Sequence, residues 1–116
     1  MVKCDCPIET VAQIIGSKWV ILILKDLFLG KSRFNEFLES NPNLHNKVLA
    51  SKLKEMQKNG LIERVTSKDS LEINYVLTPL GHSFKPAFAE LASLGKTYCN
   101  NETEFTRYVE VVTIKE

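Results

Sequence analysis

Residues 32–77 read SRFNEFLESNPNLHNKVLASKLKEMQKNGLIERVTSKDSLEINYVL, and they open with two helical patterns separated by a proline. The first pattern, from Arg33 to about Glu39, places apolar side chains along one side of a helix. The run Asn41-Pro42-Asn43 ends this helix, because proline and the residue before it both resist helical backbone. The second pattern runs from about Asn46 to Asn59, and its apolar stripe contains Val48, Leu49, Leu53 and Met56.

After Gly60 the repeat of apolar residues changes from the helical period to alternation. Two strands are predicted, over residues 61–66 and 71–77, and a polar turn over residues 67–70 joins them. We expect one face of this hairpin to contain Leu71, Ile73, Tyr75 and Leu77. Two short helices joined by a sharp turn and followed by a hairpin are typical of a winged helix-turn-helix.

The segments on both sides of this unit are also predicted to be helical. Pro7 fits the first turn of a helix that ends at Gly16. Ser17 can cap a second helix, which runs to about Leu29 and is apolar on nearly all sides, so we expect it at the centre of the core. Downstream, a single long helix is predicted from Thr78 to about Tyr98, with an apolar seam formed by Leu80, Phe84, Ala87, Phe88, Leu91 and Leu94.

These patterns favour a protein that is mainly α with a small β-hairpin. A chain of 116 residues has room for one domain, residues 1–116, in which residues 99–116 form a C-terminal tail whose β-branched stretch can make a strand. The composition, 44% hydrophobic and 25% charged, is typical of a globular protein. The sequence has neither an apolar run of the ~20 residues that span a bilayer nor a secretion signal, so we expect a cytoplasmic protein with no membrane partner.

The net charge of +1 says nothing about a nucleic-acid partner, but the distribution of charge does. Residues 31–68 contain eight Lys or Arg and four Glu, whereas residues 101–116 contain more acids than bases. Such asymmetry indicates an anionic partner for the middle of the chain.

The second helix of the helix-turn-helix has a length that fits the major groove of duplex DNA. Asn can pair with adenine and Lys can donate to guanine, whereas lysines at the flank and at the hairpin tip suit phosphates or the minor groove. The candidate DNA-binding residues are Lys18, Arg33, His45, Asn46, Lys47, Ala50, Ser51, Lys52, Lys54, Lys58 and Lys68. The alternative is that these side chains only solvate an amphipathic helix.

An ordered set of short motifs runs over about residues 6–98: Cys6-Pro7-Ile8-Glu9, Gly16-Ser17-Lys18-Trp19, Ile23-Leu24, Gly30, Arg33-Phe34-Asn35-Glu36-Phe37, Leu49, Leu53-Lys54-Glu55-Met56, Gly60-Leu61-Ile62-Glu63-Arg64 and Tyr75-Val76-Leu77-Thr78-Pro79-Leu80-Gly81. The set resembles the HxlR-type winged-helix transcriptional regulators, a branch near the MarR regulators. The resemblance implies a homodimer joined by its N- and C-terminal helices, which binds a pseudo-palindromic duplex operator and represses transcription. The sequence departs from the family at Leu44-His45, where an Ile-Ser pair is common, and after residue 99.

Three cysteines, Cys4, Cys6 and Cys99, are an odd number, which argues against a disulfide framework. Cys6 directly precedes the first helix, whose partial positive charge stabilises a thiolate. By the resemblance, Cys6 is a candidate sensor of oxidants or of a small reactive effector. If the termini of two subunits meet, Cys99 of the other subunit could approach it to disulfide distance. The alternative is that Cys6 only packs or caps.

Other functions find little support in the sequence. It contains no glycine-rich phosphate loop and no nucleophile elbow, so we expect neither an enzyme nor a cofactor. The cysteines and the two histidines, His45 and His82, lack the spacing of zinc ligands, so no metal is expected. The remaining alternative is a winged-helix protein-interaction module without DNA binding, which would favour an apolar or acidic outer face on the helix at residues 46–59.

Overall fold

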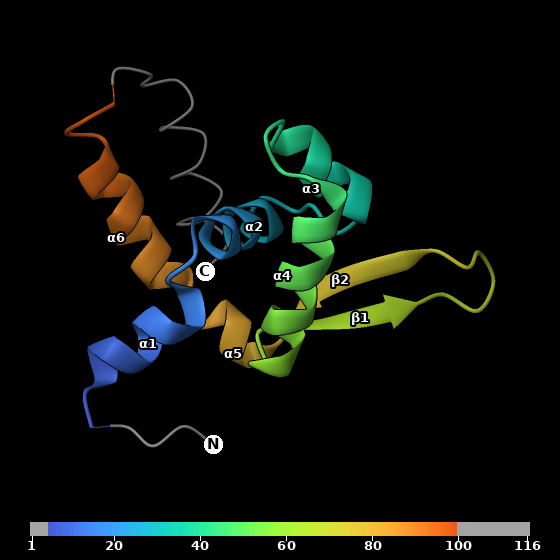
Figure 1. The fold of residues 1–116 in the computed structure, drawn as a ribbon, viewed down its shortest axis with the longest axis horizontal. Coiled ribbons are helices and arrows are strands. Elements are labelled where there is room, and N and C mark those ends of the chain that lie inside the picture. The colour runs from blue at the N-terminus through green and yellow to red at the C-terminus, as the bar shows by residue number, and fades with distance from the viewer. Residues whose placement is uncertain (1–4, 100–116) are drawn as a thin grey trace.

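The computed structural model describes residues 5–99, which form a helical body with a hairpin projecting from it (Figure 1). In chain order the elements are α1 (Pro7–Ile15), α2 (Lys18–Phe28), α3 (Phe34–Ser40), α4 (Asn46–Lys58), β1 (Ile62–Thr66), β2 (Ile73–Leu77), α5 (Pro79–His82) and α6 (Lys85–Gly95). The predicted fold class, mainly α with a small β-hairpin in a winged helix-turn-helix, is confirmed. The predicted strand in the C-terminal tail lies outside the described residues.

The predicted helix boundaries follow from local chemistry. Pro7 is the first residue of α1, and the Ser17 hydroxyl accepts a hydrogen bond from the Trp19 amide at 3.3 Å, which caps α2. Gly30 and Gly60 follow α2 and α4 with φ of +98° and +77°. Only glycine adopts this left-handed backbone without a steric cost, so both residues end their helices.

Helix α2 is the central core element, as expected. It lies between α6 and α3 in the view of Figure 1, and it buries apolar side chains toward both of them. The Phe28 ring meets the Phe88 ring of α6 edge to face, with 5.3 Å between centroids. The rest of the core comes mainly from α3, α4 and the hairpin: Phe37, Leu44, Leu49, Leu53, Met56, Leu61, Ile62 and Tyr75.

The hairpin has the predicted pairing, but its predicted apolar face is only partly buried. The two strands are antiparallel, with Ile62 opposite Leu77 and Thr66 opposite Ile73. Of the four residues expected on one face, Tyr75 is buried, whereas Leu71 is 80% exposed. Leu71 belongs to the turn, where its amide donates to the Ser67 carbonyl and its φ is +58°. The prediction was wrong here because the outer half of the hairpin extends beyond the core.

The predicted single helix over residues 78–98 is also wrong. The Thr78 hydroxyl caps α5 by accepting from the Gly81 amide at 3.0 Å, as expected. The helix then breaks, and α6 begins at Lys85 with Pro86 in its first turn. Proline has no N–H to donate to the carbonyl of His82 four residues earlier, so a continuous helix would lack that hydrogen bond. Along α6 the predicted seam is buried at Phe88 and exposed at Leu91 and Leu94.

Candidate nucleic-acid interface

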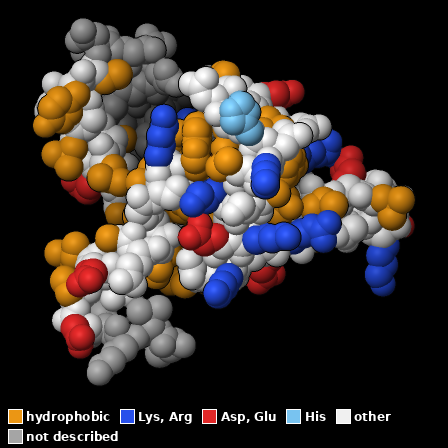
Figure 2. All heavy atoms as spheres, in the orientation of Figure 1, with side chains coloured by type: hydrophobic (Ala, Val, Ile, Leu, Met, Phe, Trp, Pro, Cys, Tyr) orange, Lys and Arg blue, Asp and Glu red, His pale blue; other side chains and the backbone are white. Residues whose placement is uncertain are grey.

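Helix α4 has one buried side and one polar side. Leu49, Leu53 and Met56 are buried in the core. The opposite side, the α4 outer face, contains four side chains spaced three or four residues apart, all of them exposed: Lys47, Ser51, Lys54 and Lys58. Figure 2 shows Lys and Arg side chains over this region and along the hairpin.

The structure brings most of the predicted site residues together on α4. His45, Asn46, Lys47, Ala50, Ser51, Lys52, Lys54 and Lys58 lie on this helix or at its N-cap. All are exposed except Ala50 and Lys52, which are half-buried, and the Lys52 ammonium lies 3.4 Å from a Glu55 carboxylate oxygen. Among the described residues, the His45 side chain makes no capping hydrogen bond to α4.

Three predicted residues lie on other elements. Lys68 is exposed in the turn at the hairpin tip. Lys18 is the first residue of α2, and its ammonium lies 4.9 Å from the centroid of the Trp19 ring. Arg33 precedes α3, and its guanidinium lies 2.6 Å from the carboxylate of Glu72, the residue directly before β2. The positive charge of Arg33 is therefore paired with a carboxylate of the same chain.

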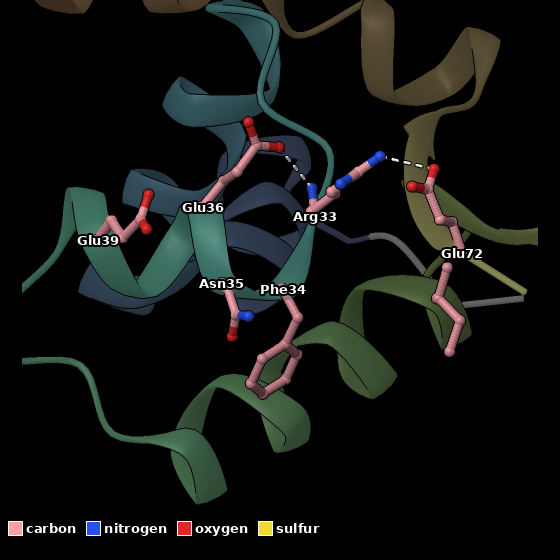
Figure 3. A pocket seen from close by; sticks show the side chains of 7 residues that line it. Arg33, Phe34, Asn35, Glu36, Glu39 and Glu72 are labelled. Atoms are coloured by element: carbon pink, nitrogen blue, oxygen red, sulfur yellow. Dashed lines mark hydrogen bonds and ion pairs between the residues drawn. The ribbon is translucent and has the colours of Figure 1, made fainter. Parts of the chain in front are cut away.

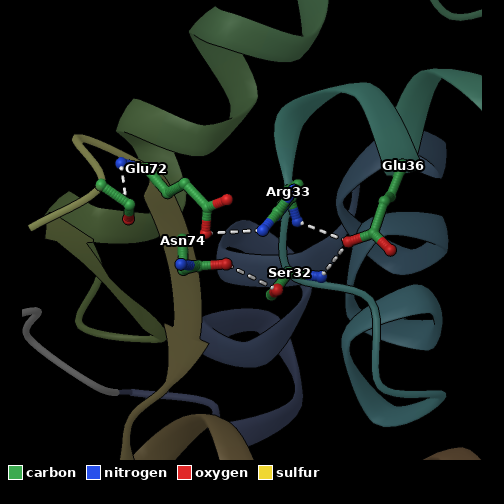
Figure 4. Close-up of polar contacts among 6 residues, drawn as sticks. Ser32, Arg33, Glu36, Glu72 and Asn74 are labelled. Carbon is green, nitrogen blue, oxygen red and sulfur yellow. Dashed lines mark hydrogen bonds and ion pairs between the residues drawn. The ribbon is translucent and has the colours of Figure 1, made fainter. Parts of the chain in front are cut away.

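Arg33 belongs to a set of contacts that attaches the hairpin to the start of α3, here called the wing clamp: Ser32, Arg33, Glu72, Asn74 and Tyr75. The Ser32 hydroxyl donates to the Asn74 side-chain oxygen at 2.9 Å (Figure 4). The Tyr75 amide donates to the Ser32 carbonyl at 2.7 Å. These contacts join residues about forty positions apart. Sequence reasoning missed Glu72 and Asn74, because no local pattern reveals such a pairing.

Glu36 fixes the other end of the clamp. Its carboxylate accepts from the backbone amides of Ser32 and Arg33, at 3.0 and 2.9 Å. These two hydrogen bonds favour the charged form, so they hold the pKa of Glu36 below its ordinary value. Figure 3 shows the hollow beside the clamp, where Arg33 points toward Glu72 and away from Glu39.

A buried carboxylate holds the turn between α3 and α4. Asp26 of α2 is fully buried, and it accepts from the Ser40 hydroxyl and from the Asn41 side-chain amide, each at 2.9 Å. The Asn41 amide also donates to the Phe37 carbonyl at 2.8 Å. Sequence reasoning treated Asn41 only as part of a helix break and missed Asp26. The available signal was the one acidic residue of a mostly apolar helix, because a carboxylate requires a polar partner when it is buried.

A groove separates α4 from the hairpin. It is lined by Phe34, Ala50, Leu53, Lys54, Gln57, Arg64 and Tyr75. Arg64 lies opposite Tyr75 in the strand register and was not among the predicted site residues. Strand alternation could have found it, because Arg64 shares a face with Ile62, which is buried against the core.

Both cysteines in the described part of the chain, Cys6 and Cys99, are exposed free thiols. Cys6 is the N-cap residue of α1, and its carbonyl accepts from the Thr10 amide. Cys4 lies outside the described residues. Within residues 5–99, no group of three or more His, Cys, Asp or Glu side chains is placed to hold a metal ion, and no helix is long and apolar enough to cross a membrane.

The arrangement of α3, α4 and the hairpin agrees with a comparison to known families. A model of the HxlR-like helix-turn-helix family matches residues 14–103, which includes the entire unit described above. The chain belongs to this family. The resemblance inferred from its motifs is confirmed.

Related sequences and solved structures agree with this membership. YdeP of Bacillus subtilis, named as an uncharacterized HTH-type transcriptional regulator, is 35% identical over 94 residues, which cover 80% of this chain and 73% of YdeP. The reduced form of the regulator YodB from B. subtilis matches with a TM-score of 0.71 at 31% identity, over 82% of this chain and 95% of YodB. The oxidized form of the redox regulator HypR matches with a TM-score of 0.74 at 28% identity, over 79% of this chain and 96% of HypR.

This HxlR-like protein is therefore a transcriptional regulator of the helix-turn-helix type. Regulators of this type bind DNA through the second helix of the motif, which is α4 here. Its relatives are named as regulators, a class that generally lacks enzymatic activity.

Proposed function

We propose that this regulator is a homodimer that binds a pseudo-palindromic duplex operator and represses transcription there. The observation that carries the proposal is the α4 outer face, in which Lys47, Ser51, Lys54 and Lys58 are exposed opposite a buried stripe. A helix with this division can enter the major groove while its other side remains in the core. An apolar or acidic outer face, as a protein-interaction module would favour, is absent from α4 as described.

The start of α4 is the part that reads base edges in this proposal. Asn46, Lys47, Ala50 and Ser51 lie in its first two turns, and His45 precedes them. Base edges are read by such residues, whereas phosphate contacts fix position and register. Lys58 at the end of α4 and Lys68 at the hairpin tip suit phosphates. Lys18, Arg33 and Lys52 are weaker candidates, because each already faces an aromatic ring or a carboxylate.

The proposed dimer interface is an apolar surface formed by α1 and the α6 segment. Its exposed members are Ile8, Val11, Leu91, Leu94 and Tyr98, and α1 has no buried residue at all. Both helices lie at the side of the molecule away from the hairpin (Figure 1). A small domain leaves much apolar area exposed, and a second copy would bury it. Two copies related by a twofold axis would present two α4 helices to one duplex.

We further propose that Cys6 responds to oxidants or electrophiles. The side chain is exposed at the start of α1, and two relatives of known structure bear on such a role. HypR has been solved in reduced and oxidized forms, and YodB in reduced and quinone-bound forms. An oxidant that takes two electrons and two protons from Cys6 and from Cys99 of the other subunit would join the subunits by a disulfide.

Diamide treatment followed by mass spectrometry tests this response. Diamide accepts the two electrons and two protons, so a Cys6–Cys99 crosslink should form and the affinity for the operator should change. Cys99→Ser should abolish the crosslink while leaving the reduced protein able to bind. An uncrosslinked protein with unchanged affinity after treatment would rule out the proposed response.

Selection of bound genomic fragments by the purified protein tests the main proposal. It should recover a set of sequences with inverted half-sites, and a reporter placed behind such a site should be expressed more strongly when the regulator is deleted. Recovery of no enriched fragments would favour the protein-interaction alternative. Fragments without any shared motif, bound with a strong dependence on salt, would show binding to DNA that is not specific for sequence.

A further inference from the structure

We propose that the groove between α4 and the hairpin is a binding site for one backbone phosphodiester of the bound duplex, held by Lys54 and Arg64. The inference rests on the proposed function, since it concerns the same DNA. It goes beyond the α4 outer face by assigning a phosphate contact to Arg64, a residue of the hairpin.

The groove has a polar rim and an apolar floor. Lys54 and Gln57 come from α4, Arg64 comes from β1, and the floor is formed by Phe34, Leu53 and Tyr75. Cations therefore approach the groove from two different elements. Glu63 does not oppose them, because successive strand residues alternate and its side chain lies on the other face of β1.

Unlike Arg33 and Lys52, the two cations of the groove have no carboxylate beside them in the described part of the chain. Within residues 5–99, neither Lys54 nor Arg64 forms an ion pair or a side-chain hydrogen bond, whereas Arg33 faces Glu72 and Lys52 faces Glu55. An exposed unpaired Arg and Lys on the walls of one groove make a local excess of positive charge. A guanidinium presents several N–H donors in a plane that matches phosphate oxygens, and the ammonium adds a second charge.

The groove is also held open before DNA arrives. The wing clamp fixes the hairpin to the start of α3, through Ser32 and Asn74 among others. Asp26 fixes the turn that leads into α4. When α4 enters the major groove, its flank approaches the sugar-phosphate backbone. The hairpin lines the groove along this flank, so Arg64 would face the same stretch of backbone. The site therefore needs little rearrangement to take a phosphate.

The test compares charge-removing variants by the salt dependence of duplex binding. Arg64→Gln and Lys54→Gln should each weaken binding to duplex DNA. For each variant, the loss should be the same on the operator and on an unrelated duplex, because a phosphate contact does not read sequence. The slope of log K against log salt is negative, and its magnitude should decrease by about 0.9 for each phosphate that is no longer neutralised. Arg64→Lys, which retains the charge, should restore most of the slope. Lys85→Gln, on α6, is the matched control and should leave the slope unchanged.

The outcomes separate this inference from the proposed function. If Arg64→Gln leaves the slope unchanged while Lys47→Ala still weakens binding, the groove assignment is wrong and the regulator still binds through α4. If Arg64→Gln alters sequence preference instead, Arg64 contacts a base and the assignment is also wrong. If no variant has an effect because the wild type binds no duplex, the proposed function fails. Thermal unfolding should show that both exposed-site variants fold as the wild type does.

A second arm distinguishes a phosphodiester of DNA from a free phosphate-bearing molecule. Inorganic phosphate is titrated into the full chain at constant ionic strength, and the amide resonances of Lys54 and Arg64 are followed by NMR. We expect no saturable shift at millimolar phosphate and a clear shift with duplex. Saturable binding of phosphate alone would overturn the assignment to duplex DNA.

Discussion

The α4–hairpin side and the α1–α6 side of the molecule differ in what each leaves unsatisfied. On the first side, backbone and side-chain hydrogen bonds hold the elements. The exposed groups there include the cations Lys47, Lys54, Lys58, Arg64 and Lys68, none of which forms an ion pair within residues 5–99. On the second side, α1 buries no residue and α6 buries only Phe88, and the exposed groups are apolar. The first side therefore has several cations without a paired anion, and the second has apolar helix faces that no part of residues 5–99 covers.

This difference indicates two partners of opposite chemistry. Unpaired cations on a preformed surface suit a polyanion, and they bind it with a strong dependence on salt. Exposed apolar side chains suit another protein surface, and their burial depends little on salt. A perturbation on one side should therefore affect one kind of binding and leave the other largely intact.

The largest expected effect is the loss of stability in Phe88→Ala. Leu94→Ala, on the same helix, should instead weaken the dimer. Phe88 is 3% exposed and packs on Phe28, so Phe88→Ala should lower the free energy of unfolding by about 3–5 kcal/mol. Leu94 is 62% exposed, so Leu94→Ala should change the unfolding of the isolated subunit by less than about 0.5 kcal/mol. It should instead raise the dissociation constant of the dimer. Urea titrations and sedimentation at several protein concentrations measure the two quantities, and a dimer indifferent to Leu94→Ala would argue against that interface.

A somewhat smaller loss of stability is expected at Asp26. Asp26→Ala leaves the Ser40 hydroxyl and the buried Asn41 amide without their acceptor, so the free energy of unfolding should fall by about 3 kcal/mol. Asp26→Asn should cost less, because an amide oxygen can still accept one of the two bonds. Asp69→Ala, in the exposed turn of the hairpin, is the control and should have almost no effect. Equal stability of Asp26→Ala and wild type would show that α2 does not anchor the turn.

Lys47→Ala tests the α4 outer face. The side chain is exposed in the first turn of α4, so its loss should weaken operator binding without changing the unfolding curve. A base contact predicts a loss of about 1–3 kcal/mol that relaxes preference at one position. A phosphate contact predicts a uniform loss for all duplexes with a smaller salt slope. Binding that is unchanged in both respects would remove Lys47 from the interface.

The smallest expected effect is a pH dependence at Glu36. Its pKa is lowered in the folded chain, so the stabilisation is complete above the ordinary value of 4.5 and is lost as the pH falls through the lowered value. Glu36→Gln should therefore show a shallower loss of stability on acidification than the wild type. Hydrogen exchange should place the difference at the start of α3 and leave α1 unaffected. Identical acid profiles for the two proteins would show that the two backbone amides do not depend on this charge.

The sequence revealed those parts of the fold that depend on local chemistry. Ser17, Thr78, Gly30 and Gly60 cap or end helices through contacts within a few residues, and all were read correctly. Pro86 was overlooked, although its missing N–H acts just as locally.

What the sequence could not give were contacts between distant segments. The periodicity placed Leu71 on a buried face, but burial also depends on how far the core extends under the hairpin. The pairing of Arg33 with Glu72 arises only when the hairpin folds back on α3, so Arg33 could not be separated from cations such as Lys54 that have no partner in the described chain. The positions on α4 were predictable, because helical spacing alone places them on one side.

Hydroxyl-radical footprinting of the dimer on a selected operator is the most direct test of the central claim, that the outer face of α4 enters successive major grooves from two related subunits. We predict two protected segments whose centres lie about 10 base pairs apart, on one side of the duplex. Both segments should fade together in Lys47→Ala and persist in Lys85→Gln. A single segment, a spacing that does not fit whole helical turns, or protection that survives loss of the α4 side chains would contradict it.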